Sequence, residues 1–462
     1  MRRDHCRLGT GLLKTAITRL LVVGIAVLRV AVTPSSAVTG PGPASSEDNP
    51  VPVESFERGL EAFIGPLLAD GFLSGNLLVS YGGEVLYSAS YGMANIEHRV
   101  GNGPETRFCV ASLSKPMTAI AVLRLVEQKR LGLDDLVSRW IDDFPGGDEI
   151  TLEDLLTHRA GIPHRVTVPL EEARPMTAAE IVAKVRQKGL LYKPRTLRTY
   201  STAGYSVVAR VIEKATGSDY DTAMRELLFS PLGMSETAHV NARSIVPHRA
   251  SPYKAGPDGL INATLKDMSF LVGGGSLVST VGDIQRFAQA YVDRALLSEA
   301  GWEIFHDRLG WARGDVVRWS GASNGFGAAL DIHKELDLTV VFTGNAGLGA
   351  LQELRRGIPA IVFGQEHEPP KRFPPVIRLP ETTLKDYEGN YTRANGSSIT
   401  VILSDGDLYS NDGVIHPTRK DWFFSRGYYT EVEFSRGDDG QVQEMRLHID
   451  GLGTRVYRRT EG

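Results

Sequence analysis

Apolar residues along the chain follow two different periods, one typical of helices and one typical of strands. Between residues 55 and 73 they recur every three or four positions, which predicts a helix with one buried face. Two β-prone runs at 76–81 and 84–89, joined by a pair of glycines, predict a hairpin. A long apolar stretch at 117–126 then predicts a helix packed against the resulting sheet.

The middle of the chain continues with helical patterns before β character returns. Helices are expected over residues 151–158, 206–214 and 281–292. Residues 311–344 then indicate long strands, with a hairpin between 324 and 342. The sequence therefore predicts an α/β (α+β) fold in which an antiparallel sheet is flanked by a helical region.

The C-terminal part of the chain has a different pattern. A polar, proline-rich stretch at 366–380 is typical of a linker. From 381 to 462, short alternating runs are separated by Asp-Gly pairs that predict turns, at 405–406, 412–413 and 439–440. We expect this segment to form a small closed β-barrel, separate from a main domain at 55–365.

The first 37 residues indicate a secretory signal peptide. A basic lead precedes an apolar run at 20–28, and small residues precede an expected cleavage site after Ala37. Arg29 interrupts the apolar run, so a permanent membrane span is the less favoured interpretation. We expect an exported protein, periplasmic or extracellular, with a linker at 38–54; the alternative is an uncleaved N-terminal membrane anchor.

Composition narrows the function classes. The chain has 462 residues and a formal net charge of −4, which gives no basic surface for nucleic acid. Its two cysteines are Cys6, which would leave with the signal peptide, and Cys109, which is expected to serve packing. The sequence has no H-E-x-x-H motif or cluster of Cys and His, so we expect neither a metal nor a cofactor.

The strongest candidate chemistry lies at Ser112 and Lys115. A β-prone lead-in and Pro116 place Ser112 at the N-terminus of the helix that follows. Residues three apart share a helical face, so the Lys115 amine should reach the Ser112 hydroxyl. A lysine can activate a serine when burial and a helix N-terminus lower its pKa. The spacing alone is weak evidence, because S-x-x-K also occurs by chance.

Two further side chains are candidates for proton transfer. Tyr200 precedes the helix at 206–214, and beside an ammonium the pKa of its phenol would fall from about 10, which suits a proton relay. A merely packed aromatic is the alternative. His158 could be a base, but the favoured interpretation is a core histidine or one that contacts the last carbonyls of its own helix.

Taken in order, these motifs resemble those of the penicillin-binding and class C β-lactamase-like serine hydrolases, a family that includes DD-peptidases, D-aminopeptidases and carboxylesterases. The resemblance covers about residues 55–362. The motifs lie at 111–115, 155–158 with 161–163, 200–205, 231–234, 279–280 with Asp283, and 320–321 with 325–326. The tail, with Leu384, Tyr387, Gly389 and Tyr391, looks like the lipocalin-like β domain often attached to such enzymes.

The resemblance implies a role for each matching position. Ser112 would be the acylated nucleophile, Lys115 its activating partner, and Tyr200 the group that passes a proton to the leaving group. The backbone N–H groups of Ser112 and Ala322 would form the oxyanion hole. The residues expected to contact substrate are Thr202, Trp319, Ser320 and Gly321.

Two positions depart from the family pattern. Thr202 stands where the family usually has Asn, and Trp319 where it has Lys or His. Trp cannot hold a carboxylate as a cation does, which argues against efficient turnover of β-lactams or D-alanyl-D-alanine peptides. Esterases that the chain resembles often have Trp there. A strand aromatic packed in the core is the alternative interpretation of Trp319.

We therefore expect a serine hydrolase that acts through an acyl-enzyme on small acyl esters, with a small-molecule ester, amide or peptide as its substrate and no nucleic acid as a partner. The alternatives are a D-alanyl-D-alanine carboxypeptidase, a D-aminopeptidase or a weak β-lactamase, and an inactive binding protein. A rival nucleophile is Ser323, because residues 321–325 match G-x-S-x-G. This pattern is the nucleophile elbow of α/β-hydrolases, which requires a helix directly after the serine. Strands are expected after Ser323 instead.

Overall fold

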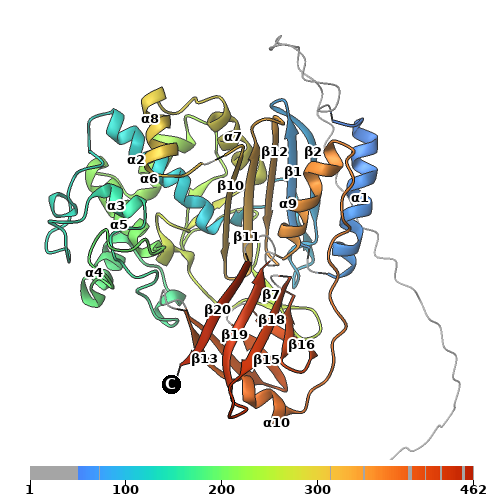
Figure 1. The fold of residues 1–462 in the computed structure, drawn as a ribbon. Helices are drawn as coiled ribbons and strands as arrows, with labels where there is room; N and C mark the ends of the chain where they lie inside the picture. The colour runs from blue at the N-terminus through green and yellow to red at the C-terminus, as the bar shows by residue number, and fades with distance from the viewer. Residues whose placement is uncertain are drawn as a thin grey trace, which may run out of the picture.

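A five-stranded antiparallel sheet forms the centre of the protein, which we describe from a computed structural model (Figure 1). The structure describes residues 50–462 except 72, 313, 347–348, 394–397, 411–412, 427–428, 450–452 and 461–462. The strand order is β10-β11-β12-β1-β2. The strands are β1 (Gly75–Tyr81), β2 (Glu84–Tyr91), β10 (Val316–Ser323), β11 (Phe326–His333) and β12 (Leu338–Gly344). Both predicted hairpins are confirmed, and β10 lies at an edge.

Two helices cover one face of this sheet, and a larger helical region covers the other (Figure 1). α1 (Val53–Ala69) and α9 (Gly349–Val362) pack together on the first face. The helix predicted for 55–73 ends at Ala69, because Gly71 adopts a left-handed backbone with φ of 77°. α7 (Val281–Val292) packs on the other face and matches its predicted bounds.

The helical region surrounds α2 (Ser114–Glu127), most of whose residues are buried. A helix that is buried on all sides has no polar face, as the apolar stretch at 117–126 indicated. Around it lie α3 (Leu152–Leu156), α4 (Ala178–Lys188), α5 (Thr202–Thr216), α6 (Tyr220–Met224) and α8 (Glu299–Glu303). α5 begins four residues earlier than predicted, because Ser201 caps it by accepting a 2.8 Å hydrogen bond from the N–H of Gly204.

Short strands connect the sheet to the helical region. β5 (Phe108–Cys109) pairs with β9 (Leu277–Ser279), which also pairs with β6 (Ala238–His239). β3 (Met93–Asn95) and β4 (Val100–Gly101) form a separate pair. Cys109 is 2% exposed, which confirms its packing role.

Eight strands near the C-terminus form a closed antiparallel barrel, because β15 pairs with both β14 and β16 (Figure 1). The predicted small barrel is confirmed. α10 (Glu381–Leu384) precedes it. Its strands are β13 (Gly389–Thr392), β14 (Ser398–Ser404), β15 (Asp407–Ser410), β16 (Gly413–Arg419), β17 (Trp422–Ser425), β18 (Thr430–Arg436), β19 (Val442–Ile449) and β20 (Gly453–Thr460).

Two contacts between the barrel and the main domain, among the described residues, bear on the position of the site. Phe424 and Tyr429 belong to the core beneath α9. A hairpin of the main domain, formed by β7 (Tyr253–Ala255) and β8 (Leu260–Asn262), joins the barrel sheet through β16.

The expected signal peptide at 1–37 and all but the end of the expected linker at 38–54 lie outside the described residues, so export stays a prediction. Within the described ranges, no helix has both the length and the apolar character needed to cross a bilayer.

Candidate active site

Ser112 lies in a tight turn between strand β5 and helix α2. The 3₁₀ turn Ala111–Leu113 precedes the first residue of α2, and Ala111 adopts a left-handed backbone with φ of 45°. Such a conformation is uncommon outside glycine and is concentrated at functional sites. The serine thus sits just ahead of the helix rather than inside it, close to the positive end of the helix dipole.

The edge strand β10 passes directly beside this turn. A Cβ atom on Gly321 would lie 2.1 Å from the Val110 carbonyl oxygen and 2.5 Å from the Ser112 nitrogen, so only glycine fits there. Ala322 follows Gly321 on the same strand. Because β10 has β11 as its strand partner on one side and no other partner among the described strands, some of its backbone N–H groups make no bond within the sheet.

Lys115 reaches Ser112 as the spacing predicted. Its Nζ atom lies 3.1 Å from Ser112 Oγ, 3.2 Å from Thr202 Oγ1 and 2.6 Å from the Gly274 carbonyl oxygen. The side chain is almost completely buried, with 1% exposure. Thr202, which we expected to contact substrate, is 4% exposed and holds Lys115 instead.

Burial controls the charge of this lysine. It lowers the pKa of Lys115 well below its usual value, and the positive charge of Arg165 lowers it further. Among the described residues no carboxylate forms an ion pair with Lys115 to oppose this effect. The amine is therefore biased toward its neutral form, which can accept a proton from Ser112.

Tyr200 also reaches Ser112. Its hydroxyl donates a 2.7 Å hydrogen bond to Ser112 Oγ, and its ring centre lies 4.7 Å from Lys115 Nζ. The residue is 46% exposed, so its ring borders open space. The predicted fall of its pKa is wrong: desolvation of the phenol raises the pKa of Tyr200, although hydrogen bonding with Ser112 and Thr202 acts in the opposite direction.

Two histidines hold the loop that carries Tyr200. His158 is buried, which confirms the core interpretation, and its Nδ1 accepts a 3.2 Å hydrogen bond from the N–H of Ser201. His164 was not among the predicted site residues. Its Nδ1 accepts a 3.3 Å hydrogen bond from the N–H of Thr202. Both rings lie within 5.3 Å of the Tyr200 ring. Only the pattern of a histidine shortly after Pro163 could have drawn attention to His164.

Trp319 does not line the site. It is 4% exposed, packs against Phe287 and Tyr291, and donates a 2.8 Å hydrogen bond from Nε1 to the Trp311 carbonyl. The expected contact of Trp319 with substrate is therefore wrong, because this face of β10 is covered by α7. Ser320, on the opposite face of the strand, is exposed.

The α/β-hydrolase elbow at Ser323 is also excluded. Ser323 ends β10, and the chain turns through Asn324 and Gly325 directly into β11. A strand therefore follows where the elbow requires a helix.

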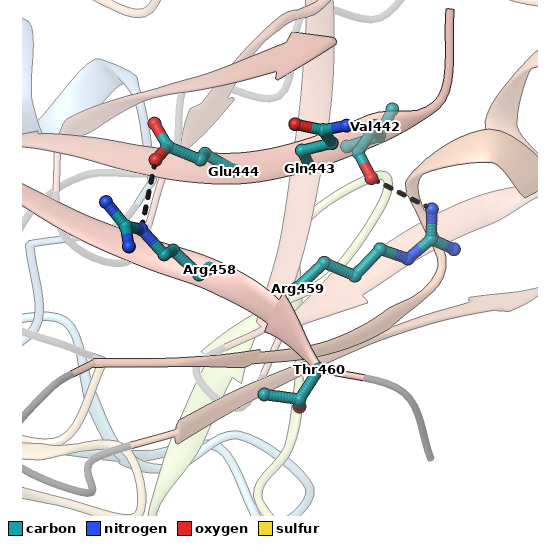
Figure 2. A pocket seen from close by; sticks show the side chains of 6 residues that line it. All are labelled: Val442, Gln443, Glu444, Arg458, Arg459 and Thr460. Atoms are coloured by element: carbon teal, nitrogen blue, oxygen red, sulfur yellow. Dashed lines mark hydrogen bonds and ion pairs between the residues drawn. The ribbon is translucent and has the colours of Figure 1, made fainter. Parts of the chain in front are cut away.

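A cavity elsewhere in the described residues lies on the barrel and lacks the groups of a catalytic site. It has a volume of about 580 Å³ and is lined only by residues of β19 and β20 (Figure 2). Its arginines are paired: Arg458 donates to Glu444, and Arg459 donates to the Val442 carbonyl. Across the described ranges, no three His, Cys, Asp or Glu side chains are grouped in a way that could hold a metal ion.

Comparison with known proteins identifies the family. A sequence profile described as beta-lactamase matches residues 60–361, about two thirds of the chain. The chain belongs to the beta-lactamase family. It is 26% identical over 430 residues to penicillin-binding protein 4* of Bacillus subtilis, covering 83% of this chain and 95% of that protein. It is 32% identical over 225 residues to esterase EstB of Burkholderia gladioli, covering 44% and 56%.

A solved structure supports the same fold. The D-amino acid amidase of Ochrobactrum anthropi superposes with a TM-score of 0.59 at 20% identity, covering 67% of this chain and 99% of the amidase. The protein is thus a beta-lactamase-family serine hydrolase whose relatives include a penicillin-binding protein and an esterase.

Replacing Trp319 tests whether this residue acts only in packing. Trp319→Ala should lower the free energy of unfolding by about 3–5 kcal/mol, as expected for a large aromatic side chain removed from a core. Trp319→Phe should restore most of the stability. For both folded variants we expect the KM of the hydrolase to stay within twofold of wild type. A large rise in KM with unchanged stability would contradict the assignment.

Acid should destabilise the fold through His158. Burial lowers the pKa of His158 to about 3 from 6.5, so the unfolded chain binds this proton first. The contribution to stability is complete above pH 6.5 and is lost as pH falls from 6.5 toward 3. His158→Asn should flatten the pH dependence of urea unfolding in this range, whereas His98→Asn, on the surface, should not. Equal slopes for wild type and His158→Asn would refute this.

Proposed function

We propose that the protein is a carboxylesterase-type hydrolase that forms an acyl-enzyme on Ser112 from small acyl esters. The observation that carries this proposal is the convergence of two groups on one oxygen. Lys115 Nζ and Tyr200 OH lie 3.1 and 2.7 Å from Ser112 Oγ. A serine needs such an adjacent base to act as a nucleophile near neutral pH.

The reaction follows from these positions. Neutral Lys115 takes the proton of Ser112 as Oγ bonds to the ester carbonyl carbon, and the carbonyl oxygen becomes an anion. Backbone N–H groups of Ser112 and Ala322 stabilise that charge. When the bond to the leaving oxygen breaks, Tyr200 donates its proton to that oxygen and recovers one from the Lys115 ammonium. Water then attacks the acyl-enzyme by the same steps in reverse, releasing the acid.

Two features favour an ester as substrate. Trp319 is buried where related enzymes carry a cation, so β10 offers no charge to hold a carboxylate at that position. Thr202 is engaged by Lys115 and is 4% exposed, so its hydroxyl is not available to an amide substrate. The similarity to an esterase supports the same choice.

A second candidate is a peptidase or amidase that accepts an acidic substrate. Arg165 favours it, because this exposed cation lies close enough to lower the pKa of Lys115. Its ion pair with Glu172 is long, at 3.8 Å, so the guanidinium could also pair with a substrate carboxylate.

A substrate panel tests the proposal. We expect kcat/KM for p-nitrophenyl acetate or butyrate to exceed that for D-amino-acid amides, D-alanyl-D-alanine peptides and a chromogenic cephalosporin by at least about 100-fold. Ser112→Ala should lose activity by about 10⁴-fold or more, since the nucleophile is removed. Ser323→Ala is the matched control and should keep full activity. Faster turnover of an amide or D-alanyl peptide would favour the second candidate.

The identity of the nucleophile is tested separately from the substrate. The measurement is mass spectrometry of the intact protein after brief exposure to a fluorophosphonate. The proposal requires one adduct, mapped to Ser112 and absent in Ser112→Ala, whereas an unlabelled wild-type protein would contradict it.

A further inference from the structure

We propose that the C-terminal barrel is a positioning element for the active site. Through the β7–β8 hairpin, it would hold the β10–β11 turn and so the backbone N–H of Ala322. The inference rests on the proposed function, because Ala322 matters only if that N–H binds the developing oxyanion. The proposed role of the barrel is to fix the position of the Ala322 N–H relative to Ser112.

The first contact joins the barrel to the hairpin. Gly413, at the start of β16, pairs in parallel with Ala255 of β7. A Cβ atom on Gly413 would lie 2.7 Å from the Ala255 carbonyl oxygen, and φ at Gly413 is 121°. Arg426, also on the barrel, donates to the Pro257 carbonyl at 3.4 Å. The barrel therefore touches the hairpin backbone directly, with no room for a side chain between them.

The second contact joins the hairpin to the turn after β10. A Cβ atom on Gly325 would lie 2.3 Å from the Tyr253 carbonyl oxygen, so the turn rests on the backbone of β7. The Asn324 side chain donates a 2.9 Å hydrogen bond to the Thr264 carbonyl, just beyond β8. The turn is thus held by β7 and by the segment that follows β8.

The consequence for catalysis follows from the position of β10. This strand lies at the sheet edge, and its last residues have β11 as their only strand partner. Ala322 lies two residues before Asn324, so a shift of the turn moves its N–H relative to Ser112. Misplacement of a catalytic group by about 1 Å can cost a factor of about 100 in rate. Substrate binding in the ground state does not depend on that N–H to the same degree.

Two barrel glycines provide a matched pair of variants. Gly413→Val introduces a side chain against Ala255. Gly440→Val makes the same change at another barrel glycine of positive φ, 76°, where nothing lies within 4 Å. We expect Gly413→Val to lower kcat on a p-nitrophenyl ester at least about tenfold with KM within twofold of wild type. Gly440→Val should leave both constants within twofold.

A third variant breaks the chain of contacts at the other end. Asn324→Ala removes the bond to Thr264 without touching the barrel, and the same fall in kcat at constant KM is expected. Thermal unfolding of each variant confirms that the protein measured is folded. If Gly413→Val does not fold, Gly413→Ala replaces it, because a single Cβ at this position already lies 2.7 Å from the Ala255 carbonyl oxygen, and Gly440→Ala is then its control. The inference is overturned if the folded variants keep the wild-type kcat. It is also overturned if kcat falls as far in Gly440→Val as in Gly413→Val.

The readout separates this inference from the proposed function. The rate of Ser112 labelling by a fluorophosphonate is measured for the same proteins, since the phosphonyl oxygen also uses the oxyanion hole. If wild-type protein hydrolyses no ester, the proposed function fails, but the labelling rates still test whether the barrel positions the Ala322 N–H. Equal labelling rates in wild type, Gly413→Val and Asn324→Ala would overturn that inference.

Discussion

The burial of one amine is the constraint on which this structure depends. Lys115 is 1% exposed and has no carboxylate partner among the described residues, so the ammonium form is strongly disfavoured. The hydrogen-bond partners of the amine are all neutral: the Gly274 carbonyl and the Thr202 and Ser112 hydroxyls. None of them stabilises the ammonium form as a carboxylate would. Lys115 is buried because α2 runs through the middle of the helical region, where nearly all sides of the helix are covered.

The second constraint is the close approach of two backbones. The β10 strand can lie beside the Ser112 turn only because Gly321 has no side chain. An edge strand is well suited to this position, since its free side can face another part of the protein. Such a strand end is also easily displaced, and the hairpin β7–β8 with the barrel behind it provides a support that the sheet itself does not.

Much of the site could be predicted from the sequence because it is local. Ser112 and Lys115 share one helical turn, and Tyr200 lies next to a helix start, so their spacing carried the information. What failed depends on tertiary packing. The burial of Trp319 is set by α7, and the rise in the pKa of Tyr200 follows from desolvation of its phenol by the surrounding protein. The Gly274 carbonyl gives no sequence signal at all, since every residue has one. The same reasoning applies to the contact between Gly413 and Ala255.

The pH dependence of Ser112 labelling tests the central claim most directly. The rate constant for reaction with a neutral fluorophosphonate should rise with pH through a single transition well below 10.5, the usual pKa of a lysine, and then stay level. Lys115→Arg should remove this transition, because a guanidinium stays charged. A wild-type rate that continues to rise beyond pH 10.5 would mean that the amine is charged at neutral pH, and the account of Lys115 as the base would be wrong.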